Sequence, residues 1–80
     1  MKIEILGMGC PKCKKLYENT HVAVNEANLQ VEVVKVEDIQ KIMDYGIMTT
    51  PAIAIDGEVK AAGRIPALDE IKQWIFAKEG

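Results

Sequence analysis

The stretch that decides the fold lies at residues 49–63, TTPAIAIDGEVKAAG. Ala52–Ile55 and Glu58–Ala62 are predicted as strands, and the Asp56-Gly57 pair between them is typical of a two-residue hairpin turn. These two strands must therefore be antiparallel neighbours. Pro51 stands directly before the first of them, which is one of the few positions where a sheet tolerates proline.

The residues before this hairpin predict the order strand, helix, strand, helix. Residues 2–6 alternate apolar and polar side chains, and residues 31–36 are rich in β-branched side chains, so both segments are predicted as strands. An amphipathic helix that ends near Asn28 is predicted between them. Its apolar stripe would consist of Cys13, Leu16, Tyr17, Thr20, Val24 and Ala27.

Two further helices are predicted from their end signals. Asp38 is a suitable N-cap for a short helix that stops at Gly46, and Pro66 fits the first turn of a last helix. The order β-α-β-α-β-β-α predicts an α/β fold in which a mixed four-stranded sheet carries helices on both faces. We expect residues 1–80 to form a single domain. The expected inner positions are Ile39, Ile42 and Met43 in the short helix, and Leu68, Ile71, Trp74 and Ile75 in the last.

The composition excludes several classes of function. The chain is 49% hydrophobic with a net charge of −2 and no basic run, so a nucleic-acid surface is not expected. No apolar segment approaches the roughly 20 residues that span a bilayer, and Glu4 interrupts what would be the apolar region of a signal peptide. We expect a cytoplasmic monomer that binds neither nucleic acid nor membrane. Structural disulfides are rare in the cytosol, so the two cysteines are expected to be catalytic or metal-binding.

Residues 7–13, GMGCPKC, carry both cysteines at the start of the first predicted helix. Positions three apart in a helix have β-carbons about 5–6 Å apart, so a small adjustment permits a disulfide. Pro11 suits the first helical position, and Lys12 adds positive charge. The positive end of the helix dipole lowers a thiol pKa from about 8.5 toward 7 or below. We predict that Cys10 attacks a disulfide as a thiolate and that the more buried Cys13 then resolves the mixed disulfide.

A substrate surface is predicted around the proline. A proline that starts a strand beside a reactive site is a candidate for a cis peptide bond, here Thr50-Pro51. The backbone of Thr50 would then face outward and pair with an extended substrate like an added strand. Met8 and Met48 flank the two site loops and are predicted to line an adaptable substrate surface.

The Cys-Pro-Lys-Cys run after a first strand, followed by Thr50-Pro51 and the AIAIDGEV hairpin, resembles the thioredoxin/glutaredoxin fold. The whole chain is similar to the small archaeal and bacterial thioredoxin-like proteins called redox-active disulfide protein 2. This resemblance implies a dithiol–disulfide oxidoreductase in which Cys10 is the nucleophile, Cys13 the resolving thiol and Pro51 the cis-proline beside them. It also implies protein disulfides as substrates, an upstream reductase or small thiol as electron donor, and no metal or organic cofactor.

The sequence departs from glutaredoxins at two places. Lys12 replaces the aromatic residue that they usually carry between the cysteines, and residues 62–65 (AGRI) replace the Gly-Gly and acidic pair that helps hold glutathione. Arg64 is the remaining candidate for binding a substrate carboxylate.

The opening motif also permits a different class of function. Gly-Met-x-Cys-x-x-Cys is the pattern of heavy-metal-associated domains, and two thiolates suit copper(I). Those domains run β-α-β-β-α-β, whereas residues 31–36 are followed here by a predicted helix. A structural zinc site requires four ligands, and the sequence provides only Cys10, Cys13 and His21 as candidates. The sequence favours redox chemistry, with a soft-metal carrier as the alternative and a redox-sensing adaptor without turnover as a third reading.

Overall fold

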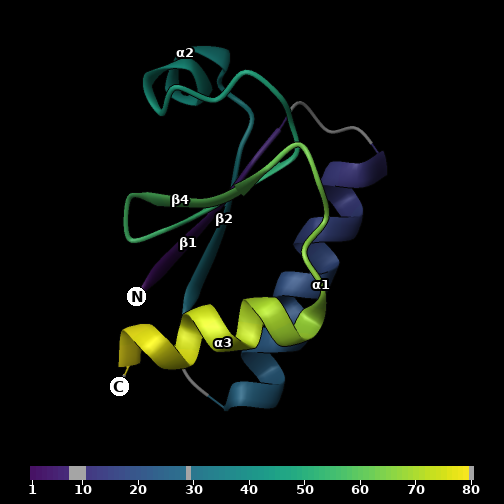
Figure 1. Ribbon diagram of the computed structural model, residues 1–80, viewed down its shortest axis with the longest axis vertical. Coiled ribbons are helices and arrows are strands. Elements are labelled where there is room, and N and C mark those ends of the chain that lie inside the picture. Colours follow the sequence, from purple (N-terminus) through teal and green to yellow (C-terminus); the bar gives the residue numbers. More distant parts are fainter. Residues whose placement is uncertain (8–10, 29, 80) are drawn as a thin grey trace.

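The computed structural model describes residues 1–7, 11–28 and 30–79, and confirms the predicted order of elements (Figure 1). The helices and strands are β1 (Lys2–Leu6), α1 (Pro11–Ala27), β2 (Glu32–Val36), α2 (Ile39–Asp44), β3 (Ala52–Ile55), β4 (Glu58–Ala62) and α3 (Leu68–Glu79). The predictions for Met8 and Cys10 lie outside the described residues. No helix in the described part of the chain is long and apolar enough to cross a membrane.

The four strands form one mixed sheet in the order β2-β1-β3-β4. β1 is parallel to β2, and it is antiparallel to β3, which in turn is antiparallel to β4. Because β1 is central and parallel to β2, residues that follow these two strands emerge at the same end of the sheet. The start of α1 and the segment after Val36 therefore share that end.

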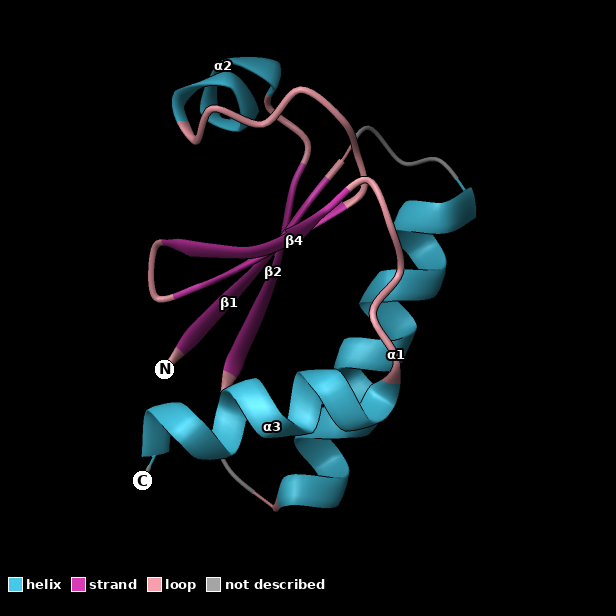
Figure 2. Ribbon diagram, in the orientation of Figure 1, coloured by secondary structure: helices cyan, strands magenta, loops and turns pink. Residues whose placement is uncertain are grey.

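One face of the sheet is covered by α1 and α3, as Figure 2 shows. Side chains alternate along a strand, so Ile3 and Ile5 of β1 point to this face together with Ile53 and Ile55 of β3. They pack against residues of both helices to form the larger core: Leu16, Ala23 and Val24 from α1, and Ile71 and Ile75 from α3. The predicted stripe of α1 is thus largely correct, with Tyr17 and Ala27 only partly buried.

The opposite face carries α2 and a smaller core made by Leu6, Val36, Ile42, Ile47, Ala52 and Ala54. Asp38 caps α2 as predicted, because its carboxylate accepts a 3.0 Å hydrogen bond from the backbone N–H of Gln40. The predicted inner face of this helix is wrong at two positions: Ile39 and Met43 are 60% and 63% exposed. A helix of six residues presents little more than one position to the sheet, and the segment after it supplies the rest of the contact.

Tyr45 connects the segment after α2 to β1, one of the two inner strands of the sheet. Its hydroxyl donates a hydrogen bond to the Glu4 carboxylate of β1. This hydrogen bond, then burial, then the negative charge of Glu4 raise the pKa of Tyr45 to about 12. Glu4 therefore faces the α2 side of the sheet, away from α1.

The hairpin and the last helix also test the prediction. Asp56 and Gly57 have φ values of 50° and 85°, as a tight turn of this sequence requires. The last helix begins at Leu68 and not in the turn that contains Pro66, and the carbonyl of the preceding Ala67 accepts a 3.1 Å hydrogen bond from the Ile71 N–H. Pro66 is instead fully buried before the helix.

Candidate functional site

Cys13 lies in the first turn of α1, which begins at Pro11 as predicted. Its residue surface is only 6% exposed, whereas Pro11 and Lys12 are exposed. The buried position follows from helical spacing, because Cys13 shares a face with the fully buried Leu16 and Thr20. The helix start therefore places one of the two thiols against the sheet and leaves Lys12 in solvent.

Gly7, directly after β1, is the residue against which the Cys13 side chain packs. A β-carbon on Gly7 would overlap Cys13 Sγ and would lie 3.1 Å from Cys13 Cβ. The backbone N–H of Gly7 donates a 3.0 Å hydrogen bond to the carbonyl of Val36, so Gly7 extends the β1–β2 pairing by one residue. Glycine is required here because only a bare α-carbon leaves room for the sulfur.

The Thr50-Pro51 segment also approaches Gly7. The same hypothetical β-carbon would be 3.8 Å from Thr50 Cβ, which places Thr50 and Cys13 around one backbone position. The Thr50–Pro51 peptide bond is cis, in agreement with the prediction. Thr50 is exposed and Pro51 is fully buried.

Gly63 fixes the position of this loop from the end of β4. Its N–H donates a 2.8 Å hydrogen bond to the Pro51 carbonyl. With a φ of 78° it adopts a conformation that favours glycine, and a β-carbon there would come within 2.7 Å of Thr49 Oγ1. The loop that carries Thr50 is thus held between Gly7 and Gly63.

Met48 precedes this loop and is 96% exposed, the most exposed of the large apolar side chains described. Met48 and Thr50 therefore give the loop an outward surface that is both apolar and polar.

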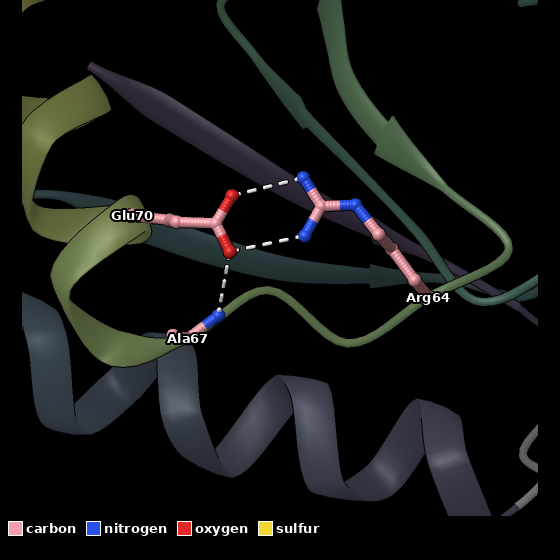
Figure 3. Close-up of polar contacts among 3 residues, drawn as sticks. All are labelled: Arg64, Ala67 and Glu70. Atoms are coloured by element: carbon pink, nitrogen blue, oxygen red, sulfur yellow. Dashed lines mark hydrogen bonds and ion pairs between the residues drawn. The ribbon is translucent and has the colours of Figure 1, made fainter.

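Arg64 does not point into this site. Its guanidinium forms a two-pronged ion pair with the Glu70 carboxylate at 3.0 and 2.9 Å, and Glu70 also accepts a 3.1 Å hydrogen bond from the Ala67 N–H (Figure 3). The Arg64 hydrogen bonds and then the Ala67 N–H lower the pKa of Glu70, and Glu70 in turn raises the pKa of Arg64. Both terminal nitrogens of Arg64 bind Glu70 at the start of α3. This argues against the prediction that Arg64 binds a substrate carboxylate.

The residues considered for metal binding are Cys10, Cys13 and His21, of which Cys10 lies outside the described residues. His21 is exposed and packs edge-on against Tyr17, with ring centroids 4.5 Å apart. Within residues 1–7, 11–28 and 30–79, no three His, Cys, Asp or Glu side chains cluster where they could hold a metal ion. The decisive observation on the copper alternative is the fold: α2 stands between β2 and β3, so the scaffold is not β-α-β-β-α-β.

Two charged residues near Cys13 were missed by sequence reasoning. Lys35 and Glu37 line a cavity that Cys13 also lines. Lys35 Nζ lies 4.5 Å from the centroid of the ring of Tyr17, and Tyr17 follows Cys13 by one helical turn. The alternation of side chains along β2 indicated which of its residues share a face. The register between β1 and β2 was also needed to show that this face lies beside Cys13.

The elements follow the order β-α-β-α-β-β-α, and a buried cysteine in the first turn of α1 lies near the loop with the cis-proline. This is the architecture of a thiol–disulfide oxidoreductase of thioredoxin fold. The chain belongs to the thioredoxin domain family, whose sequence model matches residues 1–76.

Curated relatives agree with this assignment. The chain is 42% identical to a thioredoxin of Methanocaldococcus jannaschii over 71 residues, which cover 89% of this chain and 81% of the relative. It is 38% identical to a thioredoxin of Methanothermobacter thermautotrophicus over 73 residues, covering 91% and 95% of the two chains. A probable thioredoxin of Methanothermobacter marburgensis is 36% identical over 79 residues, covering 94% and 92%. The protein is accordingly a dithiol–disulfide oxidoreductase, and such exchange moves electrons through sulfur alone, without a cofactor.

Proposed function

We propose that Cys10, Pro11, Lys12 and Cys13 form the redox centre of this enzyme and that its substrates are protein disulfides. The observation that carries the proposal is the packing around Gly7, which brings Cys13 and Thr50 to one backbone position. Residues 1–80 act as a single thioredoxin-like domain, as a monomer in the cytoplasm.

The roles of the two thiols follow from burial. Cys13 is 6% exposed, so it is poorly placed to meet a protein substrate first. Cys10, as the thiolate stabilised by the start of α1, attacks the substrate disulfide and forms a mixed disulfide. The Cys13 thiolate then attacks the Cys10 sulfur, which closes the Cys10–Cys13 disulfide and releases the reduced substrate. A reductase or a small thiol restores the dithiol.

The loop before β3 presents the substrate. Thr50 and Met48 are exposed next to the buried Pro51, so an extended substrate segment would pair with the Thr50 backbone while Met48 contacts its apolar side chains. Met8 contributes to the same surface from the other site loop.

The test is dithiothreitol-driven reduction of insulin disulfides by the purified protein, with Cys10→Ser and Cys13→Ser beside it. Both variants are expected to lose activity, because each removes one of the two sulfurs. Bound metal is measured on the same reduced sample. Tight one-to-one copper(I) binding with no insulin reduction would replace the proposal by the soft-metal carrier, and docking to a partner without turnover would replace it by the adaptor.

A further inference from the structure

The connection from β4 to α3, residues 63–67, is attached to the helix by one carboxylate. Glu70, the third residue of α3, accepts hydrogen bonds of 3.0 and 2.9 Å from the two terminal nitrogens of Arg64. It also accepts a 3.1 Å hydrogen bond from the backbone N–H of Ala67 (Figure 3). A glutamate at this helical position commonly pairs with the backbone just before the helix. The carboxylate of Glu70 therefore holds the connection at two points.

The part of α3 that carries Glu70 is well anchored. The adjacent Ile71 is fully buried in the larger core, together with residues of β1 and β3. Pro66, within the connection, is fully buried too. The side chains of Arg64 and Glu70 are 51% and 41% exposed, and exposed ion pairs usually contribute little. A two-pronged pair of arginine and carboxylate is an exception, because its planar geometry fixes both groups.

Gly63 transmits this constraint to the site loop. It directly precedes Arg64 in the chain, and its N–H donates a 2.8 Å hydrogen bond to the Pro51 carbonyl. A β-carbon on Gly63 would lie 2.7 Å from Thr49 Oγ1, so the loop also packs against this glycine. Thr50 stands between these two contacts. The position of the Thr50 backbone therefore depends on where the backbone of Gly63 is held.

We propose that the Arg64–Glu70 ion pair positions the substrate-binding loop, because it holds the Gly63 N–H against the Pro51 carbonyl and so orders the Thr50 backbone for an incoming protein disulfide. The inference rests on the proposed function, in which the substrate pairs with Thr50. Arg64 and Glu70 are positioning residues in this scheme, since they act through Gly63. Without the pair, binding of a protein substrate would also have to order the loop, and this cost would weaken binding.

Attraction of an acidic substrate by Arg64 would be a different role with different consequences. It predicts that Arg64→Gln raises the KM for a protein substrate and that Glu70→Gln lowers it, since the two variants change the charge in opposite directions. The positioning role predicts that both variants raise KM, because each breaks the same pair. Glu70→Gln is a clean variant, since the glutamine oxygen can still accept from the Ala67 N–H.

The experiment measures kcat and KM for insulin reduction by Arg64→Gln, Glu70→Gln and the double variant. Reaction of each reduced protein with 5,5′-dithiobis(2-nitrobenzoate) reports the thiols without binding of a protein substrate. The matched control is Glu58→Gln, which makes the same substitution and breaks a 2.8 Å ion pair with Lys60 at the other end of β4.

A second measurement follows the hydrogen bond itself. Amide hydrogen exchange, monitored by NMR, reports the opening of the Gly63 N–H from the Pro51 carbonyl. The Gly7 N–H, which donates a 3.0 Å hydrogen bond to the Val36 carbonyl, is the reference amide in the same protein. Its exchange changes only if the ion pair affects the stability of the wider fold.

We expect each single variant to raise the KM for insulin about threefold without a change in kcat, the scale of one exposed ion pair of good geometry. The Gly63 amide should exchange about threefold faster, while the Gly7 amide and the reaction with the small disulfide stay unchanged. The double variant should match the single variants, because one pair can be broken only once. Glu58→Gln should behave as the unmodified protein.

Opposite changes of KM in the two single variants would overturn the inference in favour of charge attraction. Unchanged exchange at Gly63, equally faster exchange at Gly7, or an unchanged KM would overturn it as well, and so would equal effects in Glu58→Gln. Failure of the proposed function has a separate sign. If Cys10→Ser keeps insulin reduction, the proposed redox centre is wrong, whereas the exchange rate of Gly63 still decides whether the ion pair holds the loop.

Discussion

The backbone N–H of Gly63, at the end of β4, donates a 2.8 Å hydrogen bond to the carbonyl of Pro51, at the start of β3. This bond fixes the loop that carries Thr50 beside Gly7 and Cys13. The geometry of the site therefore depends on residues far from the cysteines in sequence.

Gly63→Ala is expected to destabilise the protein and to reduce insulin reduction. The new methyl group would meet Thr49 Oγ1 at 2.7 Å, in addition to the cost of the positive φ of 78°. Gly46→Ala is the matched control, because Gly46 has a φ of 76° but open space around its α-carbon. Chemical denaturation should show about 1–2 kcal/mol lost for Gly46→Ala and more for Gly63→Ala. Equal losses, with equal activity, would show that the contact with Thr49 is unimportant.

Gly7→Ala is expected to disturb the site directly, because its methyl group occupies the space of Cys13 Sγ. Overpacking of this kind typically costs about 1–3 kcal/mol. In a double-mutant cycle with Cys13→Ala, the double variant should lose less stability than the sum of the single variants, since the sulfur is gone. Simple additivity in urea denaturation would contradict the described contact.

Tyr45→Phe tests the link between α2 and β1 through the pH dependence of stability. The pKa of Tyr45 is raised from 10.0 to about 12, mainly by its hydrogen bond to Glu4. Between these values the unfolded chain has lost the phenolic proton while the folded protein retains it, so stability falls as the pH rises. The unmodified protein should therefore lose stability more steeply than Tyr45→Phe between pH 10 and pH 12. Parallel curves would show that the hydrogen bond does not persist in solution.

Met48→Ser is expected to weaken binding of protein substrates without slowing the reaction with 5,5′-dithiobis(2-nitrobenzoate), a small disulfide. Loss of about 1 kcal/mol of apolar contact corresponds to roughly a fivefold increase in KM for insulin. Met43→Ser is the matched control, because Met43 is also exposed but lies on α2, away from the loop beside Pro51. If both variants raise KM equally, Met48 has no special role in substrate binding.

Local signals in the sequence were sufficient for most of the fold. The cap at Asp38, the turn at Asp56 and Gly57, and most of the apolar stripe of α1 appear as predicted, because each depends on neighbours within a few residues. The prediction for Met43 was wrong because periodicity alone does not tell how much of a six-residue helix touches the sheet.

The site was less accessible to prediction because its contacts join distant segments. Gly7 is needed because Cys13 Sγ fills the space that a side chain would occupy, and the sequence gives no sign of this contact. Glu37 reaches the cavity only through the β1–β2 register. Arg64 finds its partner six residues ahead, a pairing that depends on where α3 begins.

The most direct test of the central claim is to trap the mixed disulfide. The Cys13→Ser variant is incubated with oxidised insulin, the adduct is digested without reductant, and the cross-linked peptide is identified by mass spectrometry. The account predicts a disulfide between insulin and Cys10, with none formed by Cys10→Ser. An adduct through Cys13 in Cys10→Ser, or no adduct with either variant, would contradict it.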